Sequence, residues 1–172
     1  MHPAPLRFVL LGFLLLWVSA CSAPPRYEYR FVPGKTATLR QGKAESPRSA
    51  PTEVRAAIAA GNALVGQPYV YGGGHGKICS GYDCSGATSH VLRATGKLAG
   101  VLSSHEFRHY GESGPGRWIS IYVRKGHVFL VVAGLRYDTG WSGRATGRDE
   151  GPHWTMVNRP AKGCEIRHPP GL

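Results

Sequence analysis

Apolar residues recur at a helical period in two parts of the chain. The first predicts a helix over residues 53–65, which Thr52 can cap and Gly66 ends, with one apolar stripe made of Val54, Ala57, Ile58, Leu64 and Val65. The second predicts a helix over residues 84–95, where Gly96 stops it. Both helices precede the part of the chain that carries strand patterns.

Beyond residue 117 the apolar runs become short and rich in β-branched and aromatic residues, which is typical of strands. Three or four strands are expected: three over residues 118–123, 127–133 and 135–139, with Gly134 in the turn between the second and the third, and a fourth over residues 154–158. Helices first and an antiparallel sheet afterwards predict an α+β domain in which N-terminal helices pack on the sheet. We expect this domain to span residues 52–172.

The first twenty residues differ from the rest. Arg7 precedes an apolar run over residues 8–18, and small residues then lead to Cys21. The run is about a dozen residues long, whereas crossing a bilayer takes roughly 20, so residues 1–20 are typical of a signal peptide. The segment Val18-Ser19-Ala20-Cys21 resembles the lipobox of bacterial lipoproteins, in which the cysteine carries lipid. We therefore expect Cys21 to anchor the chain in the cell envelope, on the outer membrane facing the periplasm in a Gram-negative cell; the alternative is an ordinary cleavage site beside an unrelated cysteine.

Residues 21–51 are rich in Pro, Arg, Ser, Ala and Gly, so we expect a flexible tether with a short strand over residues 27–32. The chain is strongly basic, with 21 Lys and Arg against 10 Asp and Glu and a net charge of +11. No nucleic-acid-binding motif accompanies this charge, so nucleic acid is not an expected partner. The expected electrostatic partners are the anionic cell wall and lipid headgroups. The sequence indicates no oligomeric state.

The motif with the clearest chemistry is Gly81-Tyr82-Asp83-Cys84-Ser85-Gly86, at the start of the second helix. Asp83 stands where an N-cap belongs, which places Cys84 in the first turn. There the helix dipole and free N–H groups favour a thiolate, the nucleophilic form of cysteine. Ser85 and Gly86 are small and leave room for a substrate carbonyl, while the backbone N–H of Cys84 can bind an oxyanion. Two other interpretations are a structural cysteine and a metal site, the latter with spacings that match no compact pattern for His75, Cys79, Cys84 and His90.

A nucleophilic cysteine needs a base from elsewhere in the chain. Of the eight histidines, His127 suits best because it opens the most apolar strand and can be held at the sheet edge. A turn at residues 133–134 places Asp138 diagonally across the ladder, within reach of the His127 ring, which it can orient. Thr139 is a rival for this role, and a half-exposed strand histidine and a solvated Asp are the plain alternatives.

Export places cysteines in an oxidising compartment. If Cys21 carries lipid and Cys84 stays a free thiol, Cys79 and Cys164 remain as an expected disulfide pair. The alternative is that both are buried thiols.

Three segments together resemble the NlpC (NlpC/P-sixty) family of papain-like cell-wall cysteine peptidases: Tyr69-Val-Tyr-Gly-Gly73, Tyr82-Asp-Cys-Ser-Gly86 and Gly126-His-Val128. The similarity covers about residues 52–138, and Asp-Cys-Ser-Gly at a helix start is its specific part. It implies a papain-like, NlpC-type fold with Cys84 as nucleophile, His127 as base and Asp138 as the third residue. It also implies that Tyr71 is an active-site tyrosine and that Asp83 and Ser85 hold the free amino end of a stem peptide.

Many members cut the bond between D-glutamate and diaminopimelate, so the resemblance implies an endopeptidase that acts on peptidoglycan stem peptides and needs no cofactor. The sequence departs from the family in a longer stretch between Tyr71 and Cys84, in an Asp where the third residue is often His, and in lacking a wall-binding repeat. Two other functions stay open: a papain-like amidase or acyltransferase on another envelope substrate, and a non-catalytic peptidoglycan-binding lipoprotein.

Overall fold

The computed structural model describes residues 27–76, 80–140, 150–159, 161 and 163–172. In this part of the chain, two α-helices and a short 3-10 helix accompany a two-stranded and a six-stranded sheet. The helices are α1 (Thr52–Leu64), α2 (Cys84–Ala94) and η1 (Glu106–His109). The strands are β1 (Thr38–Arg40), β2 (Lys43–Glu45), β3 (Glu112–Ser113), β4 (Ile119–Arg124), β5 (His127–Val132), β6 (Leu135–Asp138), β7 (His153–Thr155) and β8 (Glu165–His168). The α+β class is therefore confirmed.

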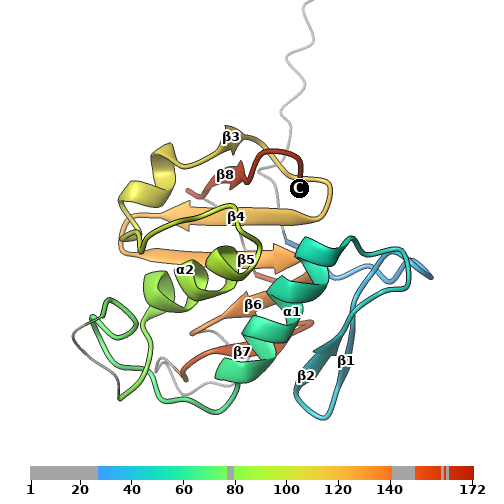
Figure 1. Ribbon diagram of the computed structural model, residues 1–172, viewed down its shortest axis with the longest axis horizontal. Coiled ribbons are helices and arrows are strands. Elements are labelled where there is room, and N and C mark those ends of the chain that lie inside the picture. The colour runs from blue at the N-terminus through green and yellow to red at the C-terminus, as the bar shows by residue number, and fades with distance from the viewer. Residues whose placement is uncertain (1–26, 77–79, 141–149, 160, 162) are drawn as a thin grey trace, which may run out of the picture.

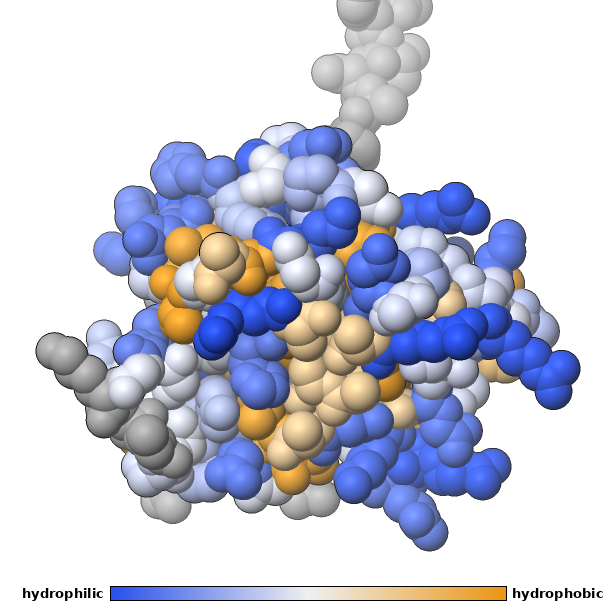
Figure 2. Space-filling view, viewed as in Figure 1, coloured by the Kyte–Doolittle hydropathy of each residue, from blue (hydrophilic) through white to orange (hydrophobic). Residues whose placement is uncertain are grey.

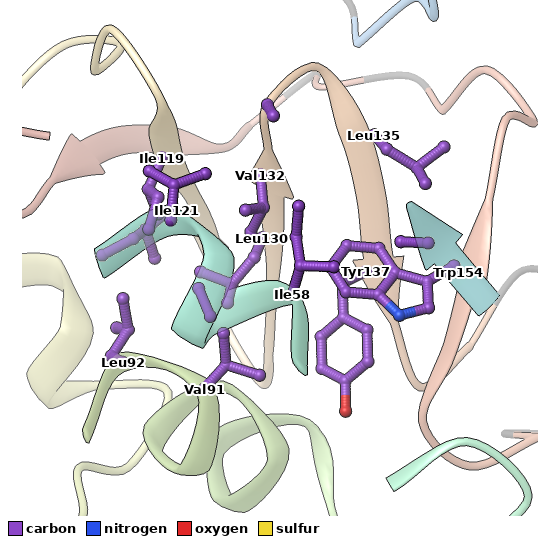
Figure 3. Packing of buried hydrophobic residues seen from close by; sticks show 14 of the residues in the cluster. Ile58, Val91, Leu92, Ile119, Ile121, Leu130, Val132, Leu135, Tyr137 and Trp154 are labelled. Carbon is purple, nitrogen blue, oxygen red and sulfur yellow. The ribbon is translucent and has the colours of Figure 1, made fainter. Parts of the chain in front are cut away.

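The six-stranded sheet runs in the order β3-β8-β4-β5-β6-β7, and its neighbouring strands are antiparallel. Both α1 and α2 lie on one face of it (Figure 1). Figure 3 shows Ile58 of α1 and Val91 of α2 meeting Leu130 and Tyr137 of the sheet in the buried core. The outer side of α1 carries several alanines, and small apolar residues accordingly gather in the middle of this face, with hydrophilic groups at both edges (Figure 2).

Side chains alternate along a strand, so the neighbours of Tyr137 on β6 point away from the helices. These neighbours are Arg136 and Asp138, both fully or almost fully buried. Tyr27 packs against Arg136, whose guanidinium lies over its ring; the Tyr27 hydroxyl accepts the Arg136 backbone N–H at 3.0 Å and donates to the Gly134 carbonyl at 3.1 Å. The predicted flexible tether over residues 21–51 is thus wrong from Tyr27 onward: Tyr27 and Ala50 are both buried in the folded domain, and its start lies well before residue 52.

The boundaries of several elements also differ from the prediction. Pro51, not Thr52, occupies the N-cap position of α1, and no side chain caps this helix. The β5–β6 turn is as predicted: Ala133 and Gly134 have φ values of 45° and 77°, the two positive angles of a tight hairpin turn. The expected strand over residues 154–158 is shorter, and β8 was not predicted.

Candidate active site

Asp83 caps α2 as predicted and sets the position of Cys84. Its Oδ1 accepts the Gly86 N–H at 2.7 Å, and Cys84 follows as the first residue of the helix. The thiol is 8% exposed and lies against the start of β5, where the Val128 N–H donates to the sulfur. Val128 follows His127 in the chain, so the part of the β5 backbone next to His127 lies beside Cys84.

Burial raises the pKa of the Cys84 thiol to about 11. The carboxylates of Asp83 and Asp138 add to this rise, while the backbone N–H groups of Val128 and Ser85 oppose it. The expectation of a thiolate in the resting protein is therefore wrong. A helix N-terminus contributes only about 0.3–1 kcal/mol at an ordinary site, which is less than desolvation costs a buried anion.

His127 is fixed by Asp138, its predicted partner. Leu130 pairs with Tyr137 across the ladder, so Asp138 lies diagonally opposite His127, and Nε2 and Oδ1 are 2.9 Å apart. An ionised carboxylate only accepts hydrogen bonds, so Nε2 carries a proton, and in the neutral ring Nδ1 then has a free lone pair. Between the described side chains of His127 and Cys84 there is no hydrogen bond, as is common in sites without substrate.

Asp138 is ionised although its side chain is fully buried. Burial acts to raise its pKa, but the hydrogen bond from His127 and the charges of His127, Arg159 and Arg136 outweigh it and hold the pKa of Asp138 below its usual value. The N–H groups of Thr139 and Gly140 also donate to Oδ1, at 2.8 and 3.2 Å. The rival Thr139 contributes only its backbone, because its buried hydroxyl has no hydrogen-bond partner among the described residues.

Sequence reasoning did not identify the two arginines beside Asp138. The Arg159 Nη1 donates to Oδ2 of Asp138, and Nε of Arg136 lies 3.7 Å from the same oxygen. Both guanidinium groups also lie over the Phe129 ring, with centroid distances of 5.3 and 5.9 Å. Side chains alternate along a strand, so the position of Arg136, two residues before Asp138 in β6, could have indicated that both side chains lie on the same face. No sequence pattern pointed to Arg159, which lies beyond β7.

The predicted substrate-binding residues Asp83 and Ser85 form a hydrogen-bonded cluster with His75. Ser85 Oγ donates to Asp83 Oδ1 at 2.9 Å, and Nε2 of His75 lies 3.3 Å from Oδ1 and 3.1 Å from the serine oxygen. A substrate amine that binds Asp83 and Ser85 must therefore displace His75. The Tyr71 side chain is 86% exposed, and its neighbour Gly72 donates an N–H to Asp83.

Gly86 has a different role from the one expected. An added Cβ would overlap the Gly73 carbonyl oxygen and contact the Gly74 Cα, so Gly86 permits the 72–74 loop to lie on the start of α2. It does not open space for a substrate carbonyl.

Cys164, one member of the predicted Cys79–Cys164 disulfide, is a free, half-buried thiol in the structure. It precedes β8, whose pairing with β4 holds it near Arg124. Cys79, like the predicted lipidation site Cys21, lies outside the described residues.

In the described part of the chain, no cluster of three or more His, Cys, Asp or Glu residues could hold a metal ion. Nor does any helix there have the length and apolar character to cross a membrane. In comparisons with known proteins, no protein-family model matches the chain, and neither does any curated protein. The candidate function therefore depends on the geometry of the site and on the sequence motifs.

Proposed function

We propose that this protein is a papain-like cysteine peptidase of the NlpC type that hydrolyses peptidoglycan stem peptides. The observation that carries the proposal is the pairing of His127, at the start of β5, with the buried Asp138, next to Val128, whose backbone N–H lies beside the thiol of Cys84 at the start of α2. A buried thiol, an imidazole with a free Nδ1 and an ionised carboxylate are the parts of a nucleophile, a base and its orienting group.

Because the thiol is the resting form, the sulfur is activated as it attacks. Nδ1 of His127 takes the thiol proton while the sulfur bonds to the scissile carbonyl carbon. The oxygen of that carbonyl becomes an oxyanion, which the Cys84 N–H can bind, since first-turn amides have no acceptor within their helix. The imidazolium then gives its proton to the leaving amine as the C–N bond breaks.

The resulting thioester is hydrolysed by water. His127 takes a proton from the water as its oxygen attacks the acyl carbon, and the C–S bond breaks to release a carboxylic acid and the Cys84 thiol. No cofactor takes part. Asp138 stabilises the imidazolium in both halves of the reaction.

The substrate assignment draws on the family resemblance. The bond between D-glutamate and diaminopimelate is the proposed target, with Asp83 and Ser85 holding the free amino end of the stem peptide once His75 has moved. Tyr71 is exposed beside this cluster and is free to contact substrate. Lipid on Cys21 would hold the enzyme at the cell envelope, and the excess of positive charge would favour contact with the anionic wall.

The test compares Cys84→Ala with Cys164→Ala on purified peptidoglycan, with mass analysis of the released muropeptides. Cys164 is the matched control, because it is also a free cysteine, half-buried where Cys84 is buried, but it lies outside the triad. We expect cleavage by the wild type and by Cys164→Ala, with products cut between D-glutamate and diaminopimelate, and none by Cys84→Ala. Cleavage that persists in Cys84→Ala would exclude Cys84 as the nucleophile, and binding without cleavage by the wild type would indicate a wall-binding protein.

A further inference from the structure

Asp138 needs a compensating charge on the side opposite His127. Its Oδ1 is occupied by the His127 ring and by the two backbone N–H groups of residues 139 and 140. Its Oδ2 faces Arg159 and Arg136, and the side chain has no exposure to water. An ionised carboxylate in such a place is stable only when hydrogen bonds and opposite charges replace its hydration.

Arg159 makes the closer contact with the carboxylate of Asp138. Its Nη1 donates to Oδ2 of Asp138 and, at 3.3 Å, to the carbonyl of Gly140. Arg136 approaches the same oxygen only at 3.7 Å, which is beyond hydrogen-bond distance. Arg159 is itself buried, at 8% exposure, and its guanidinium lies over the Phe129 ring with a centroid distance of 5.3 Å.

The position of Arg159 is fixed from a second side of the domain. It forms an antiparallel bridge with Tyr27, whose hydroxyl contacts the β5–β6 turn and the start of β6. The neighbouring Asn158 accepts the Tyr29 N–H at 3.3 Å. The segment after β7 and the first described residues of the chain thus hold this guanidinium in place behind the candidate active site.

We propose that Arg159 is a positioning residue that keeps Asp138 as an ionised acceptor and thereby fixes His127 in the Nε2–H form, with Nδ1 free to take the proton of Cys84. The inference rests on the proposed function for its catalytic meaning. Without the contact, a protonated Asp138 could donate a hydrogen bond to Nε2, and the proton of the neutral ring would then sit on Nδ1. A ring in that form has no lone pair for the thiol proton.

The experiment compares the full chain with its Arg159→Met and Arg159→Lys variants. Arg40→Met is the control, since Arg40 is an exposed arginine in a surface ion pair with Glu45, far along the chain from the site. The ring ¹⁵N signals of His127, assigned with a His127→Gln variant, report which nitrogen carries the proton and do not depend on any enzymatic activity. Cleavage of a synthetic stem peptide gives kcat and KM.

We expect the Nε2–H form in the wild type, in Arg40→Met and, through the retained charge, in Arg159→Lys. Arg159→Met should lose this fixed form and lower kcat about tenfold or more with KM little changed, since Arg159 acts through the base and not on the substrate. An Arg159→Met protein with an unchanged His127 spectrum and unchanged kcat would overturn the proposal.

A second comparison remains decisive if Arg159→Met alone does not fold. Asp138→Asn removes the carboxylate through which Arg159 acts. The double variant Asp138→Asn/Arg159→Met should therefore differ in kcat from Asp138→Asn alone by less than about twofold. A further large loss in the double variant would show that Arg159 acts by another route. If the wild type cleaves no stem peptide, the proposed function fails, whereas the ring spectra still decide whether Arg159 fixes His127.

Discussion

Alkylation of Cys84 should accelerate about tenfold for each pH unit between pH 7 and pH 10, because only the thiolate reacts. The buried thiol has a pKa of about 11, two units above its ordinary value of 9.0. At neutral pH the thiolate is therefore roughly 100-fold less abundant than in an ordinary cysteine, or about one molecule in 10⁴.

The assay is the rate of iodoacetamide modification at Cys84, measured by mass spectrometry of the peptide that contains it. A His127→Gln variant should react at a similar rate at pH 7, since in the resting site the proton stays on sulfur and the imidazole makes no hydrogen bond to it. The reasoning would be refuted by fast modification that is independent of pH between 6 and 8 and is lost in His127→Gln. That result would show a preformed thiolate–imidazolium pair.

Three further outcomes follow from the packing of the site. Asp138→Asn keeps a side-chain amide oxygen as acceptor but loses the ionised partner of the imidazole, so kcat on a stem peptide should fall about 10³- to 10⁴-fold; a fall of less than tenfold would remove Asp138 from the triad. The folded-state pKa of Cys84, about 11, exceeds its ordinary value of 9.0, so the stability that depends on the neutral thiol is complete below pH 9 and is lost as the pH rises towards 11. Urea unfolding should show a loss of about 3 kcal/mol across this range that is absent in Cys84→Ala, and equal pH dependence in the two proteins would contradict the burial of the thiol. Gly86→Ala should destabilise the fold by about 1–3 kcal/mol because its Cβ overlaps the Gly73 carbonyl, whereas Gly100→Ala, with open space around it, should change stability little in the same denaturation experiment.

Short-range signals in the sequence predicted the parts of the site that depend on local geometry. The cap at Asp83 needs only the three residues that follow it, and the hairpin that sets His127 against Asp138 needs only its two-residue turn. In both cases the local preference of a few residues agrees with the final structure, so the prediction was confirmed.

Features that depend on long-range packing were not accessible in this way. Tyr27 meets Gly134 across 107 residues, which is why a segment without apolar periodicity proved to be part of the domain. Arg159 reaches Asp138 from beyond β7, 21 residues along the chain. The protonation state of Cys84 depends on how completely the fold buries it, whereas a helix-start position alone indicated a thiolate.

Residues 169–172 follow β8 and pack against the start of β4. Leu172 is buried, and its carbonyl accepts the N–H groups of Trp118 and Ile119 at the start of β4. It thereby completes the hydrogen bonding of that strand.

Intact-mass measurement of the enzyme during turnover tests the central claim most directly. With a synthetic stem peptide and rapid acid quenching, the wild type should carry one acyl group, mapped to Cys84 as a thioester that hydroxylamine removes. His127→Gln should show no such adduct, because nothing takes the proton from the sulfur. Cleavage of the peptide with no adduct on the wild type, and at equal rate in Cys84→Ala, would contradict the account.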